Sequence, residues 1–223
     1  MRARARNPAD KLARRESILA IAEGVLSRRQ YGSLTMAEVA DACGLAKGTL
    51  YLYFASKEEL FLATLEREFA RWFDDLGREL LRRAPVSARE FADAVARSLA
   101  MRGTLADLLP LLHTVLEHNL AADTALRFKR MLRDKVVTGG ALVEQVLPGL
   151  REGDGVRLLL RTHALVVGLR QLSDPPPDIQ AVLALDELSA LRVEFERELA
   201  DALAAMAAGM STHLRSVGTS ERT

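Results

Sequence analysis

Apolar residues recur every three or four positions along most of this chain of 223 residues, which is the spacing of amphipathic α-helices. Hydrophobic residues make up 49% of the chain and aromatic residues only 5%, which favours aliphatic helix packing over a sheet-rich fold. We therefore expect an all-α protein of about nine helices. Beyond a central motif at 35–55, the helical period predicts helices at about 9–29, 56–82, 88–102, 104–120, 123–147, 156–172 and 179–210.

Between Thr35 and Leu60 the pattern predicts two short helices joined by a tight turn. Thr35 and Glu38 have the spacing of a capping box, which starts a helix. Gly44 ends that helix where a positive φ is needed, and Leu50 continues the apolar face on the next helix. This spacing is that of a helix-turn-helix, whose second helix enters the major groove of DNA.

Polar and small residues remain on the outer face of the motif. Lys47 can contact phosphate or guanine, Thr49 phosphate or a base, and Tyr51 phosphate. Lys57 lies in the first turn of a new helix, where a cation is unfavourable unless a phosphate is near. The candidate DNA-contacting residues are Thr35, Ala46, Lys47, Gly48, Thr49, Tyr51, Tyr53 and Lys57.

The residues from Gly44 to Leu60, GLAKGTLYLYFASKEEL, resemble the tetracycline-repressor-like (TetR) family of transcriptional regulators. The resemblance extends over about residues 17–62. It implies a three-helix DNA-binding domain at 1–57 that a long helix joins to a helical ligand-binding and dimerisation domain at 58–223. The first helix would brace the motif with a buried stripe of Leu12, Ile18, Ile21, Ala22, Val25 and Leu26.

Charge is distributed unevenly along the chain. Through Lys57 there are ten Lys or Arg and five Asp or Glu, a charge of +5, whereas the remainder has 21 and 25, a charge of −4. The basic part contains the helix-turn-helix, as binding to a phosphate backbone requires. Arg2, Arg4 and Arg6 form an N-terminal arm that either follows the DNA backbone or is a solvated tail.

Two C-terminal helices predict self-association. The helix at 156–172 is apolar nearly all round, so it needs cover on both sides. The stripe that follows at 179–210 adds a second apolar face. Together they resemble half of a four-helix dimer interface, so we expect a homodimer on a pseudo-palindromic operator.

The family resemblance also implies an effector pocket in the C-terminal part. The candidate lining is largely apolar, with His113 as its main hydrogen-bonding group, so a small hydrophobic or aromatic effector is expected. Ordinary core packing is the alternative explanation for each residue. The candidates are Trp72, Phe73, Phe91, Met101, His113, Leu116, Phe128, Met131, Leu165 and Gly168, with Met101 expected to point inward.

Other classes of function find little support in the sequence. His113 and His118 are five positions apart, which does not place them on one helical face as a metal-binding pair requires. The sequence contains no catalytic motif either, so no enzyme, metal or cofactor is expected. Cys43 is read as a buried apolar residue, and no apolar run is long enough for a membrane span, so a cytoplasmic protein is expected. The alternatives that remain are a helical ligand-binding or interaction protein that does not bind operator DNA, and a transcriptional activator of the same fold.

Overall fold

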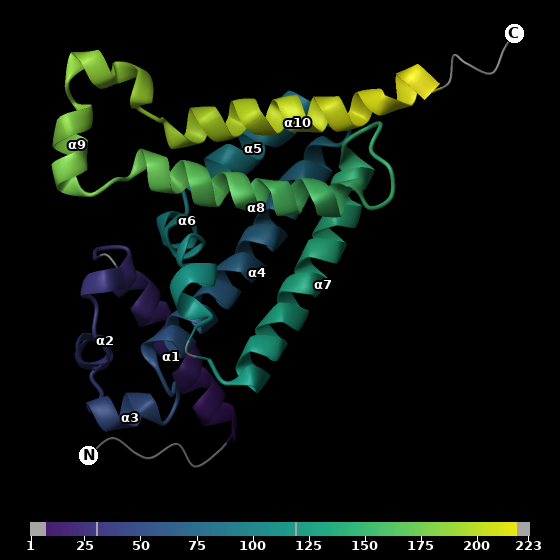
Figure 1. Ribbon diagram of the computed structural model, residues 1–223. Helices are drawn as coiled ribbons and strands as arrows, with labels where there is room; N and C mark the ends of the chain where they lie inside the picture. Colours follow the sequence, from purple (N-terminus) through teal and green to yellow (C-terminus); the bar gives the residue numbers. More distant parts are fainter. Residues whose placement is uncertain (1–7, 30, 119, 218–223) are drawn as a thin grey trace, which may run out of the picture. The chain divides into compact units, whose positions relative to one another are not determined.

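The computed structural model describes residues 8–29, 31–118 and 120–217 (Figure 1). These residues form α-helices and no strand, which confirms the all-α prediction. A 3₁₀ turn at Tyr31–Ser33, a π-helical turn at Leu112–Leu116 and a 3₁₀ helix at Asp186–Leu191 lie between them. The helices are α1 (Pro8–Leu26), α2 (Met36–Ala42), α3 (Lys47–Tyr51), α4 (Lys57–Arg83), α5 (Ala88–Ala100), α6 (Gly103–Leu108), α7 (Ala122–Val146), α8 (Asp154–Ser173), α9 (Pro177–Leu183) and α10 (Phe195–Val217).

The chain forms two compact units, and the first contains residues up to 68 together with 111–128. Its core is built by α1, α2, α3 and the start of α4 around large buried side chains. The fully buried ones include Ile18, Leu19, Leu50, Phe54, Phe61 and Leu65. The prediction for α1 was wrong at Leu12, which is 65% exposed, whereas Leu19 is buried. The core face of α1 therefore begins at Ile18, six positions later than the apolar pattern indicated.

The second unit contains residues 69–110 and 129–223. In this unit α10 runs beside both α5 and α8 (Figure 1). The start of α5 has a capping box, in which the Ser87 hydroxyl accepts the N–H of Glu90 at 3.2 Å and the Glu90 carboxylate accepts the N–H of Ser87 at 2.8 Å. Ion pairs join its helices at the surface, as between Arg89 and Asp201 at 2.6 Å.

Two helix boundaries reflect local sequence. Pro110 divides the stretch 104–120 into α6 and the π-helical turn, as its missing N–H predicts. The expectation of one helical period from residue 179 to 210 was wrong, because α9, a 3₁₀ helix and α10 occupy that range. The guanidinium of Arg192 donates to the carbonyls of Leu183, Ala184 and Leu185 at 2.7–3.0 Å, which closes the C-terminal end of α9.

Helices α7 and α8 cross at a pair of glycines in the second unit. A Cβ atom on Gly155 would lie 2.0 Å from the carbonyl oxygen of Gly140, and one on Gly140 would lie 2.7 Å from the nitrogen of Val156. The N–H of Gly155 also donates to the carboxylate of Glu144 at 2.8 Å. The crossing therefore depends on backbone-to-backbone packing that only glycine permits.

We expect Gly155→Ala to destabilise the second unit by about 1–3 kcal/mol or more, because α7 and α8 would have to separate. Thermal unfolding followed by circular dichroism measures this change. Gly24→Ala in α1 is a matched control, since its added Cβ would meet nothing within 4 Å. It should leave stability unchanged or raise it by up to about 1 kcal/mol. Equal melting temperatures for the two variants would contradict the crossing described here.

Candidate nucleic-acid interface

The turn between α2 and α3 is fixed by backbone hydrogen bonds around Gly44. This glycine has φ of 62°, in the left-handed region that the sequence predicted. Its N–H donates to the carbonyl of Asp41 at 3.0 Å, and the N–H of Leu45 donates to that of Ala40 at 2.9 Å. These are the two bonds of a Schellman motif, which end α2 and set the direction of α3.

The beginning of α2 is held by the predicted capping box. The Thr35 hydroxyl accepts the N–H of Glu38 at 3.3 Å and donates to its carboxylate, which accepts the N–H of Thr35 at 2.8 Å. These bonds lower the pKa of the Glu38 carboxyl, and Arg29 pairs with the same group. The hydroxyl of Thr35 is thus already engaged, although the residue is exposed.

The inner face of α3 is buried and its outer face is open. Leu50 and Phe54 are both 0% exposed, and the N–H of Phe54 donates to the carbonyl of Leu50 at 3.1 Å. Arg15 of α1 lies over the ring of Phe54, 4.9 Å from its centroid. A helix of five residues is not stable alone, so this packing is what holds α3 in place.

The predicted contact residues fall into two groups. Ala46, Lys47, Gly48 and Tyr51 are exposed, and Thr49 is half-buried on the same short helix. Tyr53 is also half-buried, one turn beyond Thr49. Thr35, the N-cap residue of α2, is exposed as well. Leu52, which sequence reasoning did not select, is 72% exposed beside them.

Lys57 has an internal role that the sequence did not indicate. Its ammonium donates to the carbonyl of Tyr31 at 2.6 Å and lies over the Tyr31 ring, 4.0 Å from the centroid. Burial lowers the pKa of Lys57, while burial and the neighbouring Glu58 carboxylate raise that of the Tyr31 hydroxyl. Tyr31 also packs edge-on against Phe61. Lys57 therefore ties the α1–α2 connection to the start of α4.

A second brace joins α1 to α4. The guanidinium of Arg67 pairs with the Glu23 carboxylate and donates to the carbonyl of Glu16 at 3.2 Å. The adjacent Glu66 has a buried carboxylate oxygen without a hydrogen-bond partner among the described residues. Burial raises the pKa of Glu66, although the nearby Arg127 opposes that shift. The Ser56 hydroxyl accepts the N–H of Glu59 at 3.1 Å, and this bond and those of Arg67 fix the start of α4 in the first unit. Ser56 and Glu59 have the spacing of a capping box, but the box is formed only in part, because the Glu59 carboxylate accepts the N–H of Ala55 instead of that of Ser56.

The predicted effector residues are divided between the two units. His113, Leu116 and Phe128 belong to the first, and the other seven belong to the second. Leu116 and Phe128 are fully buried, whereas the His113 side chain is 53% exposed and lies 3.3 Å from the Glu117 carboxylate.

In the second unit, two of the aromatic candidates, Trp72 and Phe73, are in contact. The Trp72 indole donates to the Ser98 hydroxyl at 2.9 Å, its ring packs edge-on against Phe73, and Phe91 is fully buried. Met131 and Leu165 are half-buried and Gly168 is exposed. The expectation that Met101 points inward was wrong, since it is 85% exposed as the residue that ends α5.

The residues that sequence reasoning missed act through contacts distant in sequence. Tyr31 and Lys57 are 26 positions apart, and Arg67 reaches residues 44 and 51 positions away. The helical period does not report such pairs. The one available signal was a lysine at the start of a helix, and in the structure its ammonium is bonded to the carbonyl of Tyr31 within the same unit. Among the described residues, no helix is long and apolar enough to cross a membrane.

Comparison with known proteins agrees with this geometry. Residues 18–64 match a family model described as bacterial regulatory proteins of the tetR family. Over 58 residues the chain is 43% identical to the transcriptional repressor KstR of Mycobacterium tuberculosis, and this match covers 26% of each chain. It is also 24% identical over 154 residues to the fatty acid metabolism regulator protein of Bacillus subtilis, covering 63% of this chain and 73% of that one. The match to KstR therefore spans only about a quarter of that relative.

A solved structure shares the whole fold. The fatty acid degradation regulator FadR from Bacillus halodurans superposes with a TM-score of 0.51 at 19% identity, covering 90% of this chain and 96% of that one. A second family model, described as the tetracyclin repressor-like C-terminal domain, matches residues 66–213, more than half of the chain. The chain therefore belongs to the TetR family, as its helix-turn-helix predicted.

Proposed function

We propose that the protein is a ligand-responsive transcriptional regulator that binds operator DNA through α3. The observation that carries the proposal is the arrangement of α3, whose Leu50 side is buried while Lys47, Gly48 and Tyr51 are exposed. A braced helix with small and polar residues at its N-terminal end fits the major groove, where such side chains reach base edges. Family membership supports the same function, and no catalytic role is proposed.

Lys57 supports DNA binding indirectly in this proposal. Its ammonium has three N–H groups, and the described contacts are one carbonyl and one ring. A phosphate near the start of α4 would be a further partner. The main effect of Lys57 is to hold the α1–α2 connection, so its removal should alter both the motif and the charge that faces DNA.

We propose further that the regulator acts as a homodimer. One recognition helix reads only a few base pairs, whereas a two-fold dimer reads two half-sites about 34–36 Å apart. The exposed residues of α8 support α8 and α10 as the interface, because Leu160, Ala164, Gly168 and Leu172 follow one face at helical spacing. Small residues at the middle of that face allow two helices to approach closely.

The effector proposed for this chain is hydrophobic, with a long acyl chain as its first candidate. The apolar, aromatic-rich surroundings of Trp72, Phe73 and Phe91 in the second unit support this class. The name of the Bacillus subtilis relative, a fatty acid metabolism regulator, supports the same choice. Effector binding would lower operator affinity, and by reciprocity DNA would weaken effector binding by the same factor.

Repression is the sign of regulation that we propose, since release by an effector is the simplest coupling of two sites. Activation by the same fold is the alternative. Reporter expression from a promoter that contains the selected operator distinguishes repression from activation. Deletion of the regulator raises expression if it is a repressor and lowers expression if it is an activator.

Lys47→Ala should reduce operator affinity without lowering the melting temperature, because Lys47 is exposed on α3. If it contacts a phosphate, the slope of log K against log salt should fall by about 0.9 and all sequences should be affected alike. If it reads a base, the loss should be about 1–3 kcal/mol on the operator and much less on random DNA. Fluorescence anisotropy with DNA selected from a random pool measures both quantities.

Lys57→Ala is the matched comparison for this prediction. It should lower both DNA affinity and the melting temperature, because the bond to Tyr31 is lost together with the charge. An operator affinity that is unchanged by Lys47→Ala, or no selection of DNA by the wild-type protein, would contradict the proposed role of α3.

Effector binding can be followed through Trp72, which is the only tryptophan of the chain. A long-chain acyl thioester should change Trp72 fluorescence and lower operator affinity about 5–150-fold. Phe91→Ala should weaken the fluorescence response while leaving affinity for DNA in the absence of thioester unchanged. A thioester that binds and leaves operator affinity untouched would refute this mechanism for that effector class.

A further inference from the structure

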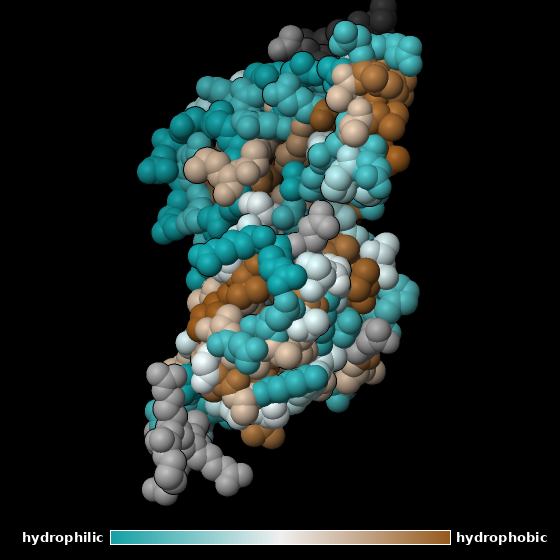
Figure 2. Space-filling view, turned by 90° about the vertical axis from the view of Figure 1, so that its left-hand side faces the viewer, coloured by the Kyte–Doolittle hydropathy of each residue, from teal (hydrophilic) through white to brown (hydrophobic). Residues whose placement is uncertain are grey.

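The segment that connects α8 to α10 has no hydrophobic core of its own. Residues 174–194, named here the acidic lobe, contain α9 and the 3₁₀ helix Asp186–Leu191, and neither helix has a buried residue. Several of its apolar side chains are about half exposed or more, namely Ile179, Val182, Leu185 and Leu191. Figure 2 looks onto the side that carries α9 and shows apolar surface exposed there among polar side chains. Exposed apolar groups that lie together in this way mark an interaction surface.

The acidic lobe is also strongly charged. Five carboxylates and one guanidinium give residues 174–194 a formal charge of −4. Asp174 pairs with Arg170 at 3.4 Å and Glu194 with Arg197 at 3.6 Å. Asp178, Asp186 and Glu187 have no ion-pair partner among the described residues. The lobe therefore presents an apolar surface edged by carboxylates that are available to an outside cation.

A groove of complementary character lies at the other end of the same helix pair. Its volume is about 660 Å³, and it is lined by the start of α8 and the later part of α10. We name it the basic groove, with Arg151, Arg157 and Arg161 on one side and Ala205, Met206 and Gly209 on the other. The residues that α10 contributes are small or apolar, so they can pack against apolar side chains like those of the lobe.

Of the groove's three arginines, Arg157 forms an ion pair, whereas Arg151 and Arg161 have none among the described residues. Two carboxylates also line the groove, and one of them, Asp154, pairs with Arg157 at 3.3 Å and accepts the N–H of Arg151 at 2.9 Å. Among the described residues, the Arg161 guanidinium contacts a thioether, that of Met210 at 3.3 Å, and no carboxylate. Three guanidinium groups against two carboxylates leave the groove with net positive charge.

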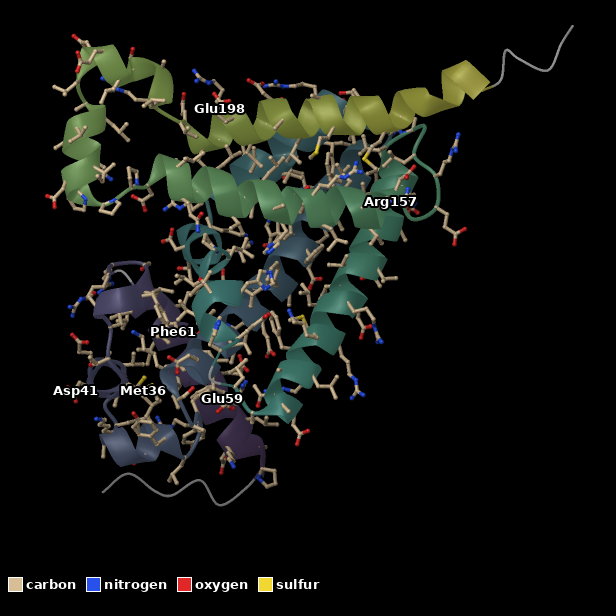
Figure 3. The ribbon with its side chains drawn as sticks, viewed as in Figure 1. Met36, Asp41, Glu59, Phe61, Arg157 and Glu198 are labelled. Carbon is tan, nitrogen blue, oxygen red and sulfur yellow. The ribbon has the colours of Figure 1, made fainter. Side chains whose placement is uncertain are left out.

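The lobe and the groove are separated by the length of α8. Its 20 residues correspond to about 30 Å, with the groove at the first turns and the lobe after the last. Figure 3 shows the same separation, with Arg157 at one end of the α8–α10 pair and Glu198 near the other. A single copy therefore cannot place its lobe in its own groove.

We propose that the acidic lobe of one copy docks in the basic groove of a second copy. The inference rests on the homodimer proposed above and specifies its geometry. In a two-fold dimer with α8 antiparallel to the partner's α8, each lobe comes beside the opposite groove, and the contact is made twice. Charge favours the antiparallel arrangement, because a parallel arrangement would bring together two lobes that each have a formal charge of −4. Exposed Leu160, Ala164 and Gly168 would lie between the two contacts.

Charge reversal tests the contact in the full-length protein. Arg157→Glu with Arg161→Glu should weaken dimerisation roughly tenfold or more, because carboxylates would then face carboxylates. Asp186→Arg with Glu187→Arg should have the same effect, and the four changes combined should restore most of the lost affinity. Analytical ultracentrifugation over a dilution series measures the dimer dissociation constant.

The matched control reverses two arginines on α7, Arg130→Glu with Arg133→Glu, which lie outside the proposed contact and are exposed. These changes should leave the dimer dissociation constant within about twofold. Circular dichroism of each variant checks that the fold is retained. Equal weakening by control and groove variants would overturn the proposal, since only net charge would then matter.

Cross-linking provides a second measurement that does not depend on charge. Leu185 is 52% exposed in the lobe, and a Cβ on Gly209 would meet nothing within 4 Å in the groove. A Leu185→Cys chain mixed with a Gly209→Cys chain should give a covalent dimer with a short bis-maleimide, and neither chain alone should do so. Wild type is the background control, since its one cysteine, Cys43, is buried.

The outcomes separate this inference from the function on which it rests. A wild-type protein that is monomeric at micromolar concentration would overturn both the dimer and the docking of the lobe. A dimer that resists charge reversal and gives no mixed cross-link would overturn the docking alone. Cross-linking of Leu185→Cys with itself would indicate the parallel arrangement and would also overturn it.

Discussion

The structure of the first unit depends on the burial of one side of a helix of five residues. Helix α3 is too short to be stable by itself, so its position is determined by Leu50 and Phe54, which are completely buried. The Schellman motif at Gly44 sets the direction in which α3 leaves α2. Because both constraints act on the inner side, the outer side can vary in sequence without loss of the fold. Lys47, Thr49 and Tyr51 lie there, where a nucleic acid would be read.

Polar contacts join the other helices of this unit. Lys57 holds the carbonyl of Tyr31, and Arg67 joins α4 to Glu23 on α1. Hydrogen bonds to charged groups contribute more to the stability of a fold than neutral ones do. The Arg67 side chain is only 12% exposed, so its bonds are partly buried. Lys57, and Arg29 through its ion pair with Glu38, belong to the basic N-terminal part and also make internal contacts, so not every lysine or arginine there is fully available to DNA.

Much of the fold follows from local sequence, and the exceptions have physical causes. The capping boxes at Thr35 and Ser87, the positive φ of Gly44 and the break at Pro110 were all predictable because each depends on residues within a few positions. Leu12 and Met101 were misjudged because an apolar residue near a helix end continues the period without reaching the core. The division of 179–210 was missed because apolar residues with no core beneath them still follow a helical period. The roles of Tyr31 and Lys57, and the Gly140–Gly155 crossing, depend on tertiary contacts that one sequence does not encode locally.

The two units have different requirements. The first needs a rigid α3, whereas the second exposes apolar side chains in the acidic lobe, where α9 has no buried residue. The claim on which the account depends is that α3 is held rigidly before DNA binds and is the surface that DNA covers. Amide hydrogen exchange with and without selected operator DNA tests this most directly. We predict that the N–H groups of Leu50 and Phe54 exchange slowly in the free protein and that exchange at 47–51 slows further with DNA. Rapid exchange at Leu50 and Phe54 in the free protein, or protection by DNA confined to another segment, would contradict the account.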